Sequence, residues 1–145
     1  MIRLAGLRDF DRRAVLAALL LVLGFAWAAP PAAGEDTAQT VRLVVDYGDG
    51  VTKTVNNLAW AKGSTVLDAM KAATARPHGI SFSYTGADAA AVLTRIDDVQ
   101  NEGGAAGKRN WQYWVNDAYG DRSFAIFELQ AQDVVLWRFT TEQGK

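Results

Sequence analysis

The stretch from Asn110 to Phe139 constrains the fold more than any other part of the chain, since it holds three of the five Trp residues within 30 positions. Residues 111–116 alternate apolar side chains with partly polar ones at a period of two, as in a half-buried β-strand. Residues 133–139 form a nearly continuous apolar run, which is typical of a strand buried on both faces at the centre of a sheet. This stretch predicts a β-rich fold with a central strand at 133–139.

A hairpin is predicted upstream. Val41–Tyr47 alternates apolar and polar side chains, and Val51–Trp60 begins with β-branched residues, so both are expected to be strands. Between them, Gly48–Gly50 (Gly-Asp-Gly) supplies residues that tolerate positive φ, as a tight hairpin turn requires.

One helix is expected after this hairpin. Ser64 is the predicted N-cap, since its hydroxyl can accept a backbone N–H of the first turn, and Asp68 suits the positive end of the helix dipole. Apolar residues then recur at helical spacing until Pro77, which disfavours helix at Arg76. A single apolar stripe of this kind is typical of a helix lying on a sheet.

The remaining segments complete the fold class. Ile80–Tyr84 and Val92–Val99 are predicted strands, Thr85–Ala91 stays open between helix and turn, and Gln100–Arg109 is a polar, Gly-rich loop. A hairpin, a helix crossing one sheet face and further strands predict an α+β, β-grasp-like domain. It would have a mixed sheet with one helix packed on one face, in the order β-β-α-β.

Residues 1–28 are predicted to be a separate segment. Four Arg residues accompany an apolar run, Ala14–Ala26, which at 13 residues is too short to span a hydrocarbon core of about 30 Å as a helix. Ala-Trp-Ala at Ala26–Ala28 fits the rule for signal peptidase, so this segment is interpreted as a secretory signal peptide cleaved near Ala28. The alternative is an uncleaved N-terminal anchor.

The mature chain is then expected to be exported, periplasmic or extracellular, with no transmembrane span. Its first part, residues 29–40, is small, polar and Pro-bearing, which predicts a flexible linker before one domain at 41–140. Without residues 1–28 the chain keeps 11 Lys or Arg and 14 Asp or Glu, a net charge of −3 with no basic cluster. Nucleic-acid binding is therefore not expected. The absence of Cys excludes disulfides and thiolate metal sites, so the domain must depend on its hydrophobic core.

Four segments, found together in this order, resemble the transcobalamin-like C-terminal domain family, a β-grasp-like domain common in exported bacterial proteins. They are Lys62–Ala73 (KGSTVLDAMKAA), Arg95–Val99 (RIDDV), Asn110–Asn116 (NWQYWVN) and Phe127–Phe139 (FELQAQDVVLWRF). In vitamin B12 carriers a similar domain is the lid over the corrinoid, beside a separate helical domain. The resemblance implies a small-ligand surface and does not by itself establish corrinoid binding.

Two positions depart from the family pattern. The family usually has Gly after the strand's Asn and before the last strand's Asp, where this chain has Asp117 and Gln132. Both are turn positions at which Gly serves a positive φ, which Asp tolerates moderately well and Gln less well. The turns are therefore expected to be longer or differently shaped, with the fold unchanged.

The aromatic hairpin provides the predicted ligand site. The apolar face of the strand 111–116 is expected in the core, which leaves Gln112, Trp114 and Asn116 on the wetter face. There Trp114 could stack on a planar ring or a sugar while Gln112 and Asn116 hydrogen-bond its edge, with Tyr119 nearby. The alternative is ordinary packing under the Gly-rich loop, which is the favoured interpretation of Tyr119.

No catalytic or metal site and no cofactor is predicted. His78, the only His, follows Pro77 in a loop, and no motif places a nucleophile beside it. Asp97 and Asp98 would face opposite ways on a strand and could not act as a paired acid and base. A calcium site matches no loop spacing; its carboxylates would be Asp97, Asp98, Glu102, Asp117 and Asp121.

The leading hypothesis is an exported, non-enzymatic binding module that holds a small molecule or a glycan through the aromatic hairpin. The second is a structural or protein-interaction module, in which a sheet edge recruits a strand of another envelope protein. The third is a hydrolase that uses His78 as a general base.

Overall fold

The computed structural model describes residues 38–141, which form an α+β domain. The predicted signal peptide at 1–28 and the predicted linker up to residue 37 lie outside the described residues. Between residues 38 and 141, no helix has the length and apolar character needed to cross a membrane. The first strand begins at Thr40, one residue before the predicted start of the domain.

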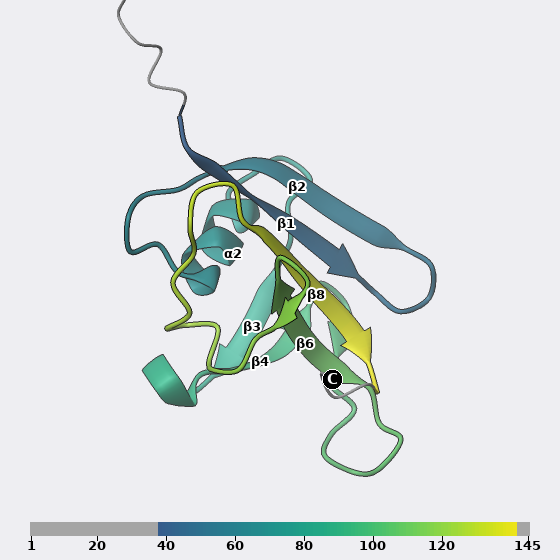
Figure 1. Cartoon of the computed structure of the whole chain (residues 1–145). Coiled ribbons are helices and arrows are strands. Elements are labelled where there is room, and N and C mark those ends of the chain that lie inside the picture. Colours follow the sequence, from purple (N-terminus) through teal and green to yellow (C-terminus); the bar gives the residue numbers. More distant parts are fainter. Residues whose placement is uncertain (1–37, 142–145) are drawn as a thin grey trace, which may run out of the picture. The chain divides into compact units, whose positions relative to one another are not determined.

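The larger of two sheets has five strands in the order β2-β1-β8-β6-β7 (Figure 1). They are β1 (Thr40–Asp46), β2 (Thr52–Ala59), β6 (Asn110–Val115), β7 (Ala118–Tyr119) and β8 (Val134–Thr140). β8 runs parallel to β1 and antiparallel to β6, whereas β1–β2 and β6–β7 are antiparallel pairs. The predicted mixed, β-grasp-like sheet is confirmed, and the apolar strand predicted at 133–139 is its centre.

The smaller sheet consists of β3 (Phe82–Thr85), β4 (Val92–Ile96) and β5 (Val99–Gln100), with a short 3-10 helix, η1 (Asp88–Ala90), between the first two. The prediction of one strand over 92–99 is wrong at its end. The chain reverses at Asp97 and Asp98, and β5 pairs back onto β4. Asp97 has φ 46°, a left-handed conformation that Asp adopts more readily than most residues.

The helix α2 (Val66–Thr74) begins one residue later than predicted, because Thr65 and not Ser64 is its N-cap. The backbone N–H of Asp68 donates to the Thr65 hydroxyl (3.3 Å), and the N–H of Thr65 donates to the Asp68 carboxylate (3.0 Å). This reciprocal capping box satisfies two helix-end donors at once. The Ser64 hydroxyl instead accepts the N–H of Ala61, in the turn that leads to the helix.

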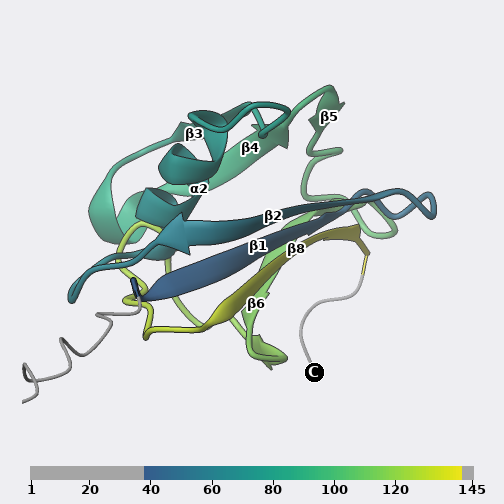
Figure 2. The same cartoon turned by 90° about the horizontal axis from the view of Figure 1, so that it is seen from above.

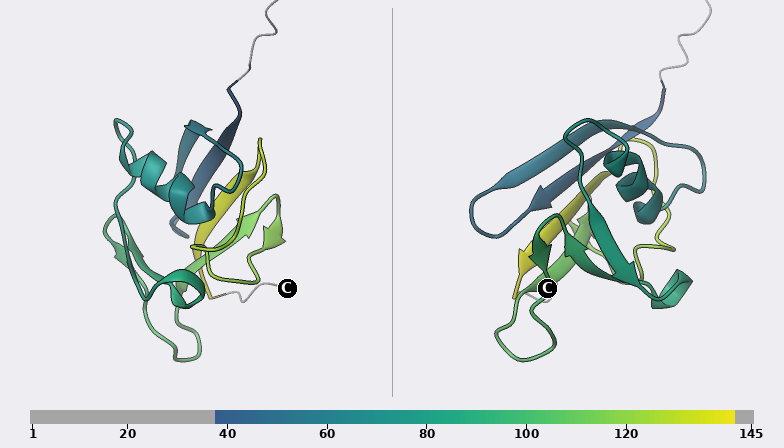
Figure 3. Two further views of the ribbon diagram at one scale, coloured as in Figure 1. Left: turned by 90° about the vertical axis from the view of Figure 1, so that its left-hand side faces the viewer. Right: turned by 180° about the vertical axis from the view of Figure 1, so that it is seen from behind.

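Both α2 and the smaller sheet lie on the same side of the larger sheet (Figure 2, Figure 3). The core fills the space between them, and the alternation predicted for 111–116 is confirmed from Trp111 to Val115, where β6 ends. The side chains that β6 and β8 bury there are Trp111, Tyr113, Val115, Val135, Trp137 and Phe139. Their rings pack closely, with the centroids of Tyr113 and Trp137 only 5.1 Å apart.

Asp117 and Gln132 both hold positive φ angles, of 66° and 72°. Asn116 (φ 48°) and Asp117 are the two residues of the β6–β7 turn, since Val115 pairs directly with Ala118. Two successive positive φ angles are typical of a type I′ hairpin turn. This turn is therefore not lengthened by the loss of glycine, and Asp117 occupies the left-handed conformation itself.

Candidate functional site

The larger sheet has a second face, opposite α2, on which partly exposed side chains form a row across four strands. Val44 pairs with Leu136, Leu136 pairs with Trp114, and Trp114 pairs with Tyr119. The residues on either side of Leu136 and Trp114 along their strands are buried in the core, so these two side chains point away from it. We call this surface, made by Val44, Gln112, Trp114, Tyr119, Leu136 and Arg138, the open face.

Trp114 lies at the centre of the open face and contacts two of its neighbours. Its ring meets that of Tyr119 edge-on, with centroids 5.6 Å apart. The guanidinium of Arg138 lies 5.6 Å from the centroid of the Trp114 ring, within reach of a cation–π interaction. Arg138 is itself held in place by Asp46, to which its Nε donates at 2.9 Å. Trp114 is thus fixed in orientation while remaining only half-buried.

Gln112 is the cross-strand partner of Arg138 on the same face. Its side-chain oxygen is buried and finds no hydrogen-bond partner among residues 38–141. An unpaired buried acceptor costs about 1–3 kcal/mol.

Asn116 lies at the rim of the open face, but its amide is already engaged. Its Nδ2 donates to Asp133 Oδ1 (2.7 Å), and its Oδ1 accepts the N–H of Val134 (2.9 Å). These bonds join the β6–β7 turn to the start of β8. Asn116 also lines a shallow hollow of about 320 Å³ beside Val44, Asp117, Val134 and Leu136. Of the four predicted site residues, three share the open face and Asn116 is mainly a structural residue at its edge.

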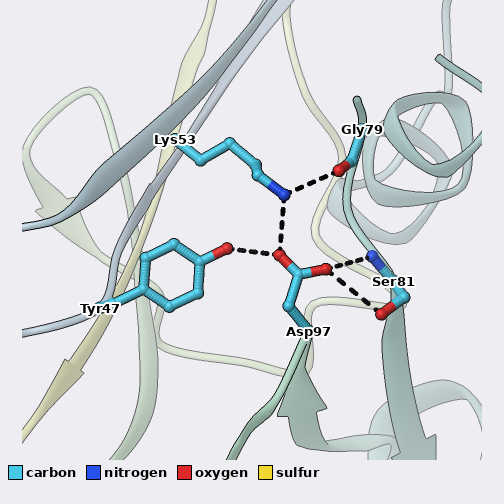
Figure 4. Close-up of polar contacts among 5 residues, drawn as sticks. All are labelled: Tyr47, Lys53, Gly79, Ser81 and Asp97. Atoms are coloured by element: carbon cyan, nitrogen blue, oxygen red, sulfur yellow. Dashed lines mark hydrogen bonds and ion pairs between the residues drawn. The ribbon is translucent and has the colours of Figure 1, made fainter. Parts of the chain in front are cut away.

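Apart from the open face, the structure has a polar cluster centred on Asp97, which the sequence did not reveal (Figure 4). One oxygen of its carboxylate accepts from Lys53 Nζ (3.0 Å) and from the Tyr47 hydroxyl. The other accepts from the backbone N–H (2.8 Å) and the hydroxyl (3.2 Å) of Ser81. Lys53 also donates to the carbonyl of Gly79 (2.9 Å). Four segments of chain therefore meet at one side chain.

The electrostatics of this cluster favour a fixed, ionised carboxylate. Burial alone would raise the pKa of Asp97, but the hydrogen bonds from Ser81, Tyr47 and Lys53 outweigh it and hold the pKa below its ordinary value. Burial, followed by the hydrogen bond to Asp97, raises the pKa of Tyr47. Asp97 thus serves as an acceptor for its neighbours, and this arrangement suits a structural clamp better than a general acid or base.

The residues considered for catalysis or metal binding are not brought together. His78 is exposed, at φ 58°, and makes no hydrogen bond within the described part of the chain. The Glu102 carboxylate pairs with Arg109 (3.2 Å), and that of Asp121 pairs with Arg122 (2.9 Å), while Asp97 has the partners described above. Among residues 38–141, no three His, Cys, Asp or Glu side chains are grouped as a metal site requires.

Comparison with known families gives one match. The family described as "Domain of unknown function (DUF4430)" matches residues 63–141, which is more than half of the chain. The matched region runs from just before α2 to the end of β8, so it contains every open-face residue except Val44. No curated protein matches the sequence.

Proposed function

The chain belongs to the DUF4430 family, whose description carries no function, and we propose from its own geometry that it is a non-enzymatic binding module. The open face is its ligand surface. The observation that carries this proposal is the row of Val44, Leu136, Trp114 and Tyr119 in direct cross-strand register. Such a row presents a continuous aromatic and aliphatic strip, which is suited to apolar contact with one side of a ring.

The chemistry of the open face narrows the class of ligand. Trp114 and Leu136 supply apolar contact, while the partly exposed guanidinium of Arg138 supplies a polar partner on the same side of the sheet. A ligand with one flat apolar side and polar groups at its edge uses both kinds of contact. A sugar ring has this character, and so does a planar macrocycle such as the corrinoid implied by the transcobalamin-like resemblance.

The proposed location is outside the cytoplasm. The support is the sequence of residues 1–28, which has the apolar run and the Ala-Trp-Ala site of a secretory signal peptide. A small-ligand or glycan surface on an exported domain would act by capture or retention and needs no reacting group. This is consistent with the ion-paired or exposed state of the carboxylates and the His considered for catalysis.

The test is a calorimetric titration of the chain with two probes. They are cyanocobalamin and an oligosaccharide of N-acetylglucosamine. Trp114→Ala and Tyr119→Ala remove the aromatic strip. Tyr84→Ala is the matched control, because Tyr84 lies on the smaller sheet and is 40% exposed, against 42% for Tyr119. Loss of a stacked aromatic ring should weaken binding about tenfold, the equivalent of about 1.4 kcal/mol.

Binding of either probe that is weakened by Trp114→Ala and Tyr119→Ala, and kept by Tyr84→Ala, would support the proposal and identify the ligand class. If all three variants bind a probe with equal affinity, that probe binds away from the open face. Failure of the wild-type chain to bind both probes would contradict the assignment of sugars and corrinoids to this face.

A further inference from the structure

A second hollow, of about 240 Å³, lies at the end of the larger sheet where β1 and β8 begin. Arg42 on β1 and Val134 on β8 pair directly, and both line it. They lie two positions before Val44 and Leu136 on the same strands, so the hollow is on the side of the sheet that carries the open face. We call it the polar hollow, and its polar lining residues are Thr40, Arg42, Asn56, Asn57 and Gln132. Among the described residues, it shares none with the open face.

The polar side chains of this hollow are within reach of a ligand and are not engaged by the protein. Arg42, Asn56, Asn57 and Gln132 are all exposed, and none of their side chains makes a hydrogen bond or an ion pair with another residue between 38 and 141. Arg42 is unusual in this respect. Every other Arg in the same range donates to a neighbour; they are Arg76, Arg95, Arg109, Arg122 and Arg138.

Two of the amide side chains stand on backbone that glycine would adopt at lower cost. Asn57 and Gln132 hold φ angles of 54° and 72°, in the left-handed region. The pairing of β1 and β2 shifts at this point, so that Asn56 and Asn57 together lie opposite Arg42 alone, in a β-bulge. Bulges and unfavourable φ angles are found most often where a protein presents side chains to a ligand. The amides of Asn57 and Gln132 are therefore kept against the preference of the backbone.

Backbone hydrogen bonds hold these amides in position. The N–H of Gln132 donates to the Thr40 carbonyl (2.7 Å), which joins the turn before β8 to the start of β1. The guanidinium of Arg76, just after α2, donates through Nη2 to the Asn57 carbonyl (2.6 Å) and so supports the bulge. A ligand would therefore meet donors and acceptors that are already placed.

The charge of the polar hollow is positive. Among the described residues that line it, Arg42 alone carries a charge. The neighbouring Asp133 is buried, and its carboxylate already accepts from Asn116 Nδ2 (2.7 Å) and from the N–H of Gln130 (2.7 Å). The Arg42 guanidinium is thus left to pair with a negative group from outside the protein.

We propose that the polar hollow binds a small carboxylate that also carries hydroxyl groups, such as a uronic acid. A guanidinium pairs with a carboxylate through two parallel hydrogen bonds. The amides of Asn57 and Gln132 can each donate and accept, which suits hydroxyl groups. The hollow is smaller than the about 300–1,000 Å³ of pockets for drug-sized ligands, so it suits a single sugar ring. This site goes beyond the function proposed for the open face and does not depend on it.

The experiment is a titration of the ¹⁵N-labelled chain with sodium glucuronate, followed through the side-chain N–H signals of Asn57 and Gln132. Glucose is the control ligand, because it has a hydroxymethyl group in place of the carboxylate. Both amide signals should move and saturate with glucuronate, and the affinity for glucose should be about tenfold lower. The side-chain amide of Asn116 should stay in place, since it is already bonded and does not line the polar hollow.

Two substitutions test the assigned roles. Arg42→Gln removes the charge and should weaken glucuronate binding about tenfold. Arg95→Gln is its control, because Arg95 is also exposed but lies on β4 of the smaller sheet. Gln132→Gly removes one amide and relieves the positive φ, so it should weaken binding while raising Tm. These opposite changes distinguish a lost ligand contact from a damaged fold.

Several results would overturn the proposal. They are unmoved amide signals, equal affinity for glucuronate and glucose, equal binding by Arg42→Gln and Arg95→Gln, and unchanged affinity in Gln132→Gly. Inorganic phosphate that binds as tightly as glucuronate would show that the hollow attracts anions without recognising hydroxyl groups, and would also overturn it. If the Trp114 indole signal moves while the amide signals of Asn57 and Gln132 stay in place, glucuronate binds the open face instead, which would contradict the proposed site.

Discussion

Tyr47 donates its hydroxyl to Asp97, 50 positions further along the chain, and so ties the end of β1 to the turn between β4 and β5. The same carboxylate accepts from Lys53 on β2 and from Ser81 just before β3. The larger and the smaller sheet are therefore joined at one ionised group. The ring of Tyr47 also packs edge-on against Trp111, with centroids 5.7 Å apart, so the polar clamp is continuous with the core.

Asp97→Asn should destabilise the domain by about 1–2 kcal/mol. The change removes the charge that strengthens the hydrogen bonds from Tyr47, Lys53 and Ser81, and the partial exposure of the cluster limits the loss. The free energy of unfolding in urea measures it. Asp98→Asn is the control, since the neighbouring Asp98 is exposed and should change stability by less than about 0.5 kcal/mol. Equal effects of the two substitutions would mean that the Asp97 contacts contribute little.

The same cluster predicts how stability depends on pH. The pKa of Asp97 is lowered by folding, so its contribution is present above its ordinary pKa of 3.8 and is lost as the pH falls through the lower, folded value. The pKa of Tyr47 is raised, so its contribution is present below its ordinary pKa of 10.0 and is lost as the pH rises above it. Urea unfolding should be measured between pH 2 and pH 7. The wild type should have a higher free energy of unfolding than Asp97→Asn at pH 7, and this difference should disappear below about pH 4. A constant difference across this range would rule out Asp97 as the titrating group.

Asp117→Gly should stabilise the domain by about 0.5–1 kcal/mol. Asp117 holds φ 66° in a two-residue turn, and the substitution creates the Asn-Gly pair that type I′ turns favour most. Thermal unfolding followed by circular dichroism would detect the rise in Tm. Asp98→Gly, the same change at a turn residue without a positive φ, should lower stability instead. A loss of stability in Asp117→Gly would show that the Asp side chain has a role beyond the turn conformation.

Thr65→Ala should destabilise α2 by about 1 kcal/mol, because it removes the hydroxyl that accepts the N–H of Asp68. Ser64→Ala removes only a turn hydrogen bond, from the N–H of Ala61, and should cost clearly less. Urea unfolding of the two variants side by side measures the difference. A larger loss of stability in Ser64→Ala than in Thr65→Ala would indicate that Ser64 is the N-cap.

The fold was largely predictable because its strands carry a local signal. The alternation of 111–116 and the apolar run of 133–139 depend only on neighbouring residues, and both identify their strands correctly. The N-cap was missed because Ser64 and Thr65 are adjacent and either can cap a helix. The structure decides between them through Asp68, which is three residues after Thr65 and completes the capping box.

The site was only partly predictable, because its contacts connect distant segments. Alternation alone places Trp114 on the wetter face, but nothing local indicates that Leu136 and Val44 lie beside it. Alternation also places Asn116 on the wetter face and so predicts a ligand contact, since its actual partner, Asp133, is 17 positions away and gives no local signal. The role of Asp97 was missed because the turn after β4 was interpreted as strand, which hid the approach of Tyr47 and Lys53.

The position of β8 has a consequence for when this domain can form. Arg42 pairs with Val134, so the middle of the sheet joins segments from opposite ends of the domain. Synthesis proceeds from the N-terminus, and β1, β2 and α2 exist well before the strand that completes their sheet. Pairing over so long a separation is also slow, because the intervening chain must first close into a loop. A nascent chain of this kind cannot complete its larger sheet until its last strand is made, which agrees with the export that we propose for it.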